Sequence, residues 1–323
     1  MPDHHDPSGG FRNPWAKASL DARIGGLLRW WFVDRLRHPP PPDPDPSIFP
    51  FAEPRFVLPR AQDDLLTITW VGHSTFLIQL GGLNLLTAPI WSDRASPIPG
   101  IGPKRRVDPG IRFDDLPPID LVLQSHDHYD HLDDLTVCRL EATNPGARWL
   151  VPLGLTSFLR RRGVHEITEL DWWQETAHGA LTIGCTPAQH FSGRTPWRRN
   201  RTLWCGWSVR TPARRVFFAG DTGYHPEFAA IAARFGPFDV ALLPIGAYDP
   251  RWFMRPVHMD PEEAVQAAHD LGAPLVIPMH WGTFKLTDEP LDEPPRRARD
   301  AWVASGLAPE RFRQMMHGET LVA

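Results

Sequence analysis

The sequence feature that most constrains the fold is the run His126-Asp-His-Tyr-Asp-His131, which directly follows an apolar segment typical of a buried strand. Four of its six residues carry imidazole or carboxylate groups, the nitrogen and oxygen ligands that divalent metals prefer in proteins. A tight loop can turn His126 and His128 toward one metal while Asp130 and His131 face a second. The run therefore predicts a fold in which a strand ends at a metal centre.

Two metals need further ligands, and later apolar segments end in suitable residues. His190, Asp221 and His280 each follow a run that is typical of a strand. An aspartate carboxylate is the natural bridge between two cations, so we expect Asp221 to join the metals. The expected ligands are His126, His128, His190 and Asp221 for one metal, and Asp130, His131, His280 and Asp221 for the other. We expect two Zn²⁺ ions, with Mn²⁺ or Fe as alternatives.

Short β-rich runs separated by turn residues dominate the chain after its N-terminal region. The expected strands include 65–70, 75–80, 83–87, 121–124, 216–219 and 275–278, and the expected helices are 132–142, 154–162, 226–235, 261–271 and 295–305. Two runs of strands, each followed by helices, predict two sheets stacked face to face with helices outside. The expected fold class is therefore α/β.

The N-terminal region differs from the rest of the chain. Residues 1–14 are polar and rich in glycine and proline, which predicts a disordered tail. The apolar residues of 15–37 recur at three- and four-residue steps, which places them on one face of a helix. This apolar stripe consists of Leu20, Ile24, Leu27, Leu28, Trp31, Phe32 and Leu36. With the proline-rich linker that follows, residues 15–46 form an arm ahead of a main domain over 47–323.

The apolar stripe of the arm has two interpretations. Its tryptophans and the arginines of the same segment are what a helix in a lipid interface needs, with aromatic rings at the level of the headgroups. Alternatively, the stripe covers the sheets or a second copy of the chain, which would give a homodimer. The two interpretations do not exclude each other.

Composition limits the compartment and the partners. The three cysteines have no paired spacing, so we expect a reducing compartment and a cytoplasmic protein, peripheral on the membrane if the stripe lies on lipid. No apolar run is long enough for a signal peptide or a membrane span. The net charge of −4 argues against binding to nucleic acid.

Longer tracts make the chain similar to a known family. The run 126–131 resembles the HxHxDH signature of the metallo-β-lactamase superfamily, and the whole resembles the branch that contains N-acyl-phosphatidylethanolamine phospholipase D. The tracts include Phe11–Trp15, Gly72–His73, Phe218–Tyr224, Pro244–Met254, His258–Ala264 and His280–Phe284. The resemblance implies a four-layer αβ/βα sandwich with two zinc ions on the ligands given above. It also implies hydrolysis of an N-acyl-phosphatidylethanolamine to an N-acylethanolamine and phosphatidic acid.

In the expected mechanism, a metal-bridging hydroxide attacks the phosphorus while Asp130 and Asp221 hold the metals. His258 follows an aromatic tract and could hydrogen-bond a phosphoryl oxygen or donate a proton to the leaving group. Together with His258, we expect Tyr129 and Tyr248 to contact the phospholipid substrate. His73 is expected to lie behind the metal ligands.

One position departs from the family pattern. Where the family commonly has an aspartate behind the metal site, in a Thr-Asp-Pro run, this chain has Ala88. The loss of such a carboxylate typically costs 10- to 100-fold in metal affinity or activity. Two alternatives therefore stay open: a dinuclear-zinc lactone or ester hydrolase of the same superfamily, and a membrane-associated metal-binding protein with weak or no catalysis.

Overall fold

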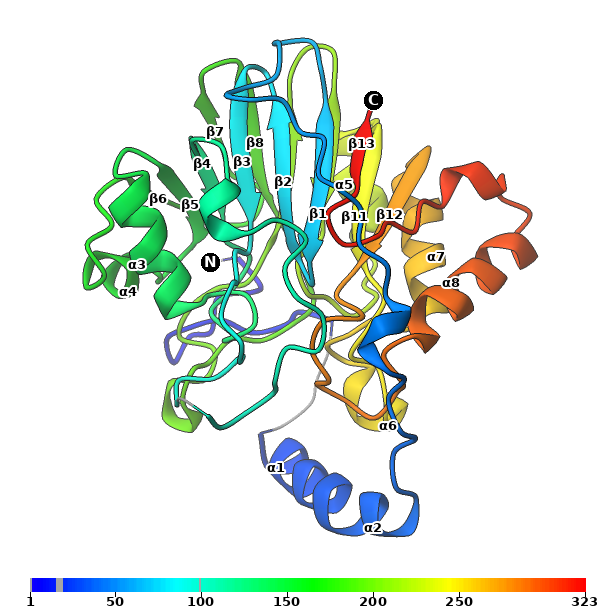
Figure 1. The fold of residues 1–323 in the computed structure, drawn as a ribbon. Coiled ribbons are helices and arrows are strands. Elements are labelled where there is room, and N and C mark those ends of the chain that lie inside the picture. The colour runs from blue at the N-terminus through cyan, green and yellow to red at the C-terminus, as the bar shows by residue number, and fades with distance from the viewer. Residues whose placement is uncertain (1, 16–19, 99) are drawn as a thin grey trace.

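The computed structural model describes residues 2–15, 20–98 and 100–323 (Figure 1). Within these ranges, seven strands form one sheet in the order β13-β1-β2-β3-β4-β5-β6, and six form another in the order β12-β11-β10-β9-β8-β7. The strands are β1 (Thr67–Gly72), β2 (Thr75–Leu80), β3 (Leu83–Thr87), β4 (Leu121–Leu123), β5 (Arg148–Pro152), β6 (Ile167–Leu170), β7 (Glu175–His178), β8 (Leu181–Thr186), β9 (Gly206–Arg210), β10 (Arg215–Phe218), β11 (Val240–Pro244), β12 (Leu275–Met279) and β13 (Thr320–Val322).

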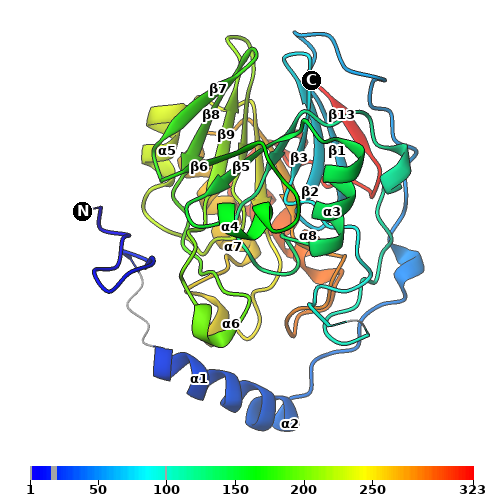
Figure 2. The same ribbon diagram turned by 90° about the vertical axis from the view of Figure 1, so that its left-hand side faces the viewer.

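The α-helices of the described residues are α1 (Leu20–Arg29), α2 (Arg35–Arg37), α3 (Asp134–Thr143), α4 (Thr156–Arg160), α5 (Phe228–Phe235), α6 (Arg251–Met254), α7 (Pro261–Leu271) and α8 (Glu293–Ala304). Five of them cover the outer faces of the two sheets. α3 and α4 lie over the seven-stranded sheet, and α5, α7 and α8 over the six-stranded sheet (Figure 2). The four layers confirm the predicted α/β sandwich.

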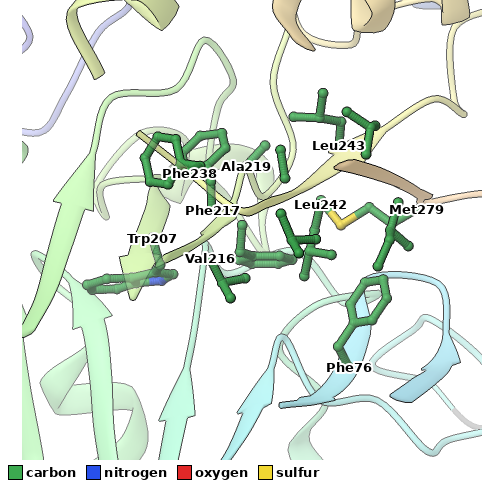
Figure 3. Close-up of a cluster of buried hydrophobic side chains, with 14 of the residues drawn as sticks. Phe76, Trp207, Val216, Phe217, Ala219, Phe238, Leu242, Leu243 and Met279 are labelled. Atoms are coloured by element: carbon green, nitrogen blue, oxygen red, sulfur yellow. The ribbon is translucent and has the colours of Figure 1, made fainter. Parts of the chain in front are cut away.

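Alternation along the strands explains the layers. In β2, Ile78 belongs to the cluster between the sheets, whereas its neighbour Leu77 packs in the cluster that includes Val137 of α3. Successive side chains of a strand point to opposite faces, so a strand with helices on one face and a sheet on the other is apolar throughout. Figure 3 shows Phe76 of β2 near Leu242 and Met279 of the other sheet. The main core therefore lies between the two sheets.

Buried indole groups join the sheets near the ends of the strands that carry the candidate ligands. Trp207 of β9 donates its indole N–H to the carbonyl oxygen of Gln124, 3.0 Å away, just after β4 ends. The backbone N–H of Cys205 donates to the carbonyl oxygen of Ser125 at 2.9 Å. Because buried polar groups are costly when unpaired, these bonds fix where the chain leaves β4 and enters the run at 126–131.

The sequence predicts a disordered tail over residues 1–14, but residues 2–14 are folded against the body of the protein. The side chain of His4 is buried, and the backbone N–H of Phe11 donates to the carbonyl oxygen of Asn200 at 2.8 Å. The tail is ordered because its polar groups find partners far away in the chain. Composition alone does not reveal such contacts.

The arm is a helix made of α1, a π-helical turn at Trp30–Asp34, and α2. It buries Trp30, which is 3% exposed, packs against Phe253 of α6, and donates its indole N–H to Asp288 at 2.5 Å. The described members of the apolar stripe face solvent instead: Leu27, Leu28, Trp31, Phe32 and Leu36. Residues 16–19 and the side chains of Leu20 and Ile24 lie outside the described residues.

The prediction that the stripe covers the sheets is therefore wrong for its five exposed residues. The arm lies at the lower end of the molecule in Figure 1, the end toward which the carboxyl ends of β3 and β4 also point. None of the described helices combines the length and the apolar character that crossing a bilayer requires.

Candidate metal centre

The first group of candidate ligands consists of three imidazoles whose nitrogens converge, those of His126 and His190 buried and that of His128 half-buried. The Nδ1 atom of His128 lies 2.9 Å from Nε2 of His126 and 3.1 Å from Nε2 of His190. His126 and His128 come from the loop after β4, and His190 from the segment after β8, so the group draws on both sheets. Burial holds the pKa of both His126 and His190 well below its usual range. Neutral imidazoles are the form that binds a metal.

The second group contains Asp130, His131 and His280. The Oδ2 atom of Asp130 lies 3.4 Å from Nε2 of His131 and 3.3 Å from Nε2 of His280. Asp130 and His131 belong to the loop after β4, whereas His280 follows β12 in the other sheet. This group too is assembled across the sandwich.

A single oxygen of Asp221 lies between the two groups. Oδ2 is 3.1 Å from Nε2 of both His131 and His280, and 3.9 and 3.8 Å from Nε2 of His126 and His190. Asp221 reaches this place from the end of β10 through Gly220, whose φ of +61° and contact of 2.7 Å between an added Cβ and the carbonyl oxygen of Cys205 leave no room for a side chain. The carboxylate has the position of a bridge.

Electrostatics couples Asp221 to the second group. Burial would raise the pKa of Asp221, but His131 and His280 outweigh it and hold that pKa well below its usual range. Burial would likewise lower the pKa of His131, but Asp221 and Asp130 outweigh it and raise the pKa to about 10. A cation at this place would displace the imidazole proton, because metal binding requires neutral histidine.

The donor atoms fit a divalent metal better than they fit hydrogen bonding. Three ring nitrogens that meet at about 3 Å cannot all be satisfied by shared protons, and ligands about 2.0–2.1 Å from a tetrahedral Zn²⁺ lie about 3.3 Å apart. Across the part of the chain that the structure describes, Nε2 of His131, Nε2 of His280 and Oδ1 of Asp221 are buried without a hydrogen-bond partner. Buried polar atoms are normally paired, so both groups could hold a divalent cation.

His73 lies behind the second group, as the sequence predicts. Its Nε2 is 2.8 Å from Oδ2 of Asp130, and its carbonyl oxygen accepts the backbone N–H of His280 at 3.1 Å. Both histidines have left-handed backbones, with φ of 53° at His73 and 63° at His280. Such conformations cost about 1–3 kcal/mol for residues other than glycine and cluster at functional sites. The two backbones therefore hold each other in place.

Asp127 and Arg194 brace the ligand loop, although neither was predicted as a site residue. The carboxylate of Asp127 accepts the backbone N–H of Gly193 at 2.7 Å and the hydroxyl of Thr202 at 3.1 Å. The guanidinium of Arg194 donates to the carbonyl oxygens of Asp127 and Leu132. The loop after β4 is thus tied to the segment that carries His190. In the sequence, the only indication that either residue supports the site is that Asp127 lies within the run 126–131.

His258 and Tyr129 lie beside the candidate ligands. The ring of His258 is 4.9 Å from that of His190 and 5.5 Å from that of His280. Tyr129 lies under the guanidinium of Arg194 at 3.9 Å, and its hydroxyl donates to the carbonyl oxygen of Arg194. Tyr129 also lines a cavity of about 680 Å³ together with Lys104, Arg194 and two exposed apolar side chains, Ile98 and Leu135.

Two predicted site residues are not brought to the ligands by any contact described above. Tyr248 is buried and donates its hydroxyl to Glu293 of α8 at 2.6 Å, beneath the guanidinium of Arg297. Ala88 follows β3 with its methyl group buried and φ of 34°, and its backbone N–H donates to the carbonyl oxygen of Leu123. The contacts of Tyr248 are those of a side chain that anchors a helix.

Known proteins are similar to this chain in sequence and in structure. A family model described as the beta-lactamase superfamily domain matches residues 84–281, a range that includes every expected ligand. An uncharacterized protein of Mycobacterium tuberculosis is 43% identical over 303 residues, which cover 92% of this chain and 78% of that protein. The N-acyl-phosphatidylethanolamine-hydrolyzing phospholipase D 1 of Caenorhabditis elegans is 43% identical over 231 residues, or 68% of this chain and 65% of that enzyme. Among solved structures, the metallo hydrolase Igni18 from Ignicoccus hospitalis has a TM-score of 0.61 at 25% identity and covers 80% of this chain and 98% of its own.

Proposed function

This chain belongs to the metallo-β-lactamase superfamily and is a metal-dependent hydrolase, and on that premise we propose that it is a dinuclear-zinc phosphodiesterase of the phospholipase D type. Its proposed substrates are N-acyl-phosphatidylethanolamine-like phospholipids, and its proposed products are an N-acylethanolamine and phosphatidic acid. The similarity to the Caenorhabditis elegans enzyme supports the class of substrate.

The observation that carries the proposal is the position of the Asp221 carboxylate. Its Oδ2 atom is within 3.9 Å of ring nitrogens from both ligand groups. One oxygen shared in this way fits two cations held close together, the arrangement that suits displacement at phosphorus. A structural metal would not need a second, adjoining set of ligands.

His126, His128, His190 and Asp221 would hold one metal, and Asp130, His131, His280 and Asp221 the other. When bound, two divalent cations activate a water molecule as a nucleophile and polarise a phosphoryl oxygen. The chain itself supplies rigidity, because the ligand loop is braced by Asp127 and Arg194. It also excludes water, since the candidate ligands are buried or nearly so.

His258 is the residue proposed to handle the leaving group. Its Nδ1 atom is buried without a hydrogen-bond partner among the described residues, and its ring is within 5.5 Å of the rings of both His190 and His280. Burial lowers the pKa of His258 to about 3, so its imidazole is neutral near pH 7. A neutral imidazole in this place can hydrogen-bond a phosphoryl oxygen or the departing alkoxide oxygen through its N–H. Tyr129, whose hydroxyl is already bonded, would present its ring to the substrate rather than its hydroxyl.

Two features support a lipid substrate. The cavity beside Tyr129 is lined by apolar Ile98 and Leu135 and by charged side chains of both signs, three of them basic and three acidic, which suits a molecule with a hydrocarbon part and a zwitterionic or polar part. The exposed apolar stripe of the arm lies at the end of the molecule where β4 delivers the ligand loop. We therefore propose peripheral contact with the membrane, in which the stripe enters the lipid interface.

Hydrolysis assays with metal analysis in parallel test the proposal. Purified protein is given an N-acyl-phosphatidylethanolamine, an acyl-homoserine lactone and a β-lactam, and its zinc, manganese and iron contents are measured on the same preparation. We expect about two zinc ions per chain and release of an N-acylethanolamine. Preferred cleavage of the lactone would make the chain a lactone or ester hydrolase. Bound metal without turnover of any substrate would leave a metal-binding protein, and no bound metal would defeat the proposal.

A further inference from the structure

Residues 2–15 form a strap along the body of the protein. This segment, which we call the N-terminal strap, runs from the β6–β7 connection to the segment that carries His190. The contacting residues lie 166 to 177 positions away in the chain. Ordering such a segment costs conformational entropy, so its contacts in the folded state must outweigh that cost.

The outer end of the strap is fixed by a carboxylate and two imidazoles. Nε2 of His4 lies 2.7 Å from one oxygen of Asp171, and Nε2 of His5 lies 2.8 Å from the other. The ring of His4 also stacks on Trp172 at 4.2 Å. Each imidazole therefore has its own carboxylate oxygen, and both hydrogen bonds go to Asp171.

The inner end of the strap reaches a candidate metal ligand. The side-chain amide of Asn13 donates to the carbonyl oxygen of His190, with Nδ2 and O 2.7 Å apart. The ring of Trp15 then stacks between Trp172 at 5.7 Å and His225 at 4.8 Å. The strap is thus anchored before Asn13, at His4 and His5, and after it, at Trp15.

The other contacts of His190 show what this bond adds. Its Nδ1 atom is bonded to the carbonyl oxygen of Val257 at 2.8 Å, which fixes the rotation of the ring and leaves Nε2 toward the candidate site. The bond from Asn13 fixes the backbone on which that ring stands. Together they hold both the main chain and the imidazole of one ligand.

We propose that Asn13 is a positioning residue for His190, and that the N-terminal strap thereby completes the three-histidine metal site. This inference rests on the proposed function, because it takes His190 as a ligand. Groups that orient a metal ligand typically contribute 10- to 100-fold to metal affinity. The strap acts on the site that contains His126, His128 and His190, and it has no described contact with Asp130, His131 or His280.

The test measures zinc release from the full-length chain. Protein loaded with zinc is mixed with a chromogenic chelator, and the release of each equivalent is followed by absorbance. The variants are Asn13→Ala and the near-isosteric Asn13→Asp, which both remove the amide donor. The control is Arg12→Ala, which alters the same strap and removes a bond to the carbonyl oxygen of Asp3 and a charge near Asp6, but leaves the amide of Asn13 in place. Melting temperatures of all four proteins are measured alongside.

We expect the first zinc equivalent to leave both Asn13 variants at least about tenfold faster than the wild type, and the second at an unchanged rate. Release from Arg12→Ala should match the wild type. Equal release from all four proteins would overturn the inference and leave the proposed function intact. Faster loss of both equivalents, in step with a lowered melting temperature, would also overturn it, since the strap would then be a general stabiliser. A wild type that holds no zinc would defeat the proposed function instead.

Discussion

Replacing two exposed aromatic side chains of the arm tests whether it lies in a lipid interface. The variant is Trp31→Ser combined with Phe32→Ser, and it leaves the buried Trp30 and its bond to Asp288 untouched. Point substitutions are preferable to deleting residues 1–40, because a deletion would also remove Asn13 and its bond to His190. The metal centre should therefore be unaffected, and any loss should concern lipid alone.

The expected effect follows from the exposed area. Trp31 is 52% exposed and Phe32 is 67% exposed. With roughly 200 Å² for each aromatic side chain, about 240 Å² faces water. At about 25 cal/mol per Å², its full transfer into lipid would contribute about 6 kcal/mol. If half of that area enters the interface, the loss is about 3 kcal/mol, or roughly a 100-fold weaker binding constant.

Flotation with vesicles of phosphatidylcholine and phosphatidylglycerol measures the binding, and hydrolysis of a vesicle-borne and a water-soluble phosphodiester measures activity. We expect the double variant to lose flotation and vesicle hydrolysis while it keeps hydrolysis of the soluble substrate. Val303→Ser, which alters an exposed apolar residue of α8, is the matched control. Equal flotation of the wild type and the double variant, or none by either, would refute the reasoning. A dimer of the wild type that the double variant cannot form would assign the stripe to a second copy.

Three further substitutions probe the centre and the core. Asp221→Asn should lower activity by more than about tenfold, because a neutral amide bridges two cations poorly; near wild-type rates at equal metal content would remove Asp221 from the bridge. Ala88→Asp should raise zinc affinity or turnover, since aspartate tolerates the left-handed backbone at φ of 34° better than alanine; a folded variant with neither gain would show that no deficit exists there. Phe217→Ala should lower the free energy of unfolding by about 3–5 kcal/mol, because Phe217 is 1% exposed between the sheets; urea denaturation would contradict this with a change below about 1 kcal/mol.

Strand ends were the part of the site that the sequence could predict. The residues His126, Asp221 and His280 each follow a short apolar run, and a run that is apolar on both faces is typical of a strand buried in a layered fold. The predicted strands 75–80 and 83–87 coincide with β2 and β3 because a Gly-Gly turn sets their register. These ligands could be predicted because each one directly follows the carboxyl end of an apolar strand.

Contacts between distant segments could not be predicted. Nothing in the composition of residues 1–14 indicates that His4 finds Asp171 or that Asn13 finds His190, and a segment rich in glycine and proline is normally disordered. Periodicity also failed to give the buried face of the arm. Trp30 lies off the apolar stripe, yet it is buried because Asp288 accepts its indole N–H. A π-helical turn at 30–34 further shifts the faces.

Each ligand group combines residues of the loop after β4 with residues that follow strands of the opposite sheet. A cation held by either group would therefore link the two sheets at one edge of the sandwich. Its binding free energy would add to the free energy of folding. The supply of zinc in the cell would then govern how long the folded chain survives as well as how fast it turns over. Chains made in zinc-poor medium would open more often at this edge and be cut sooner by proteases.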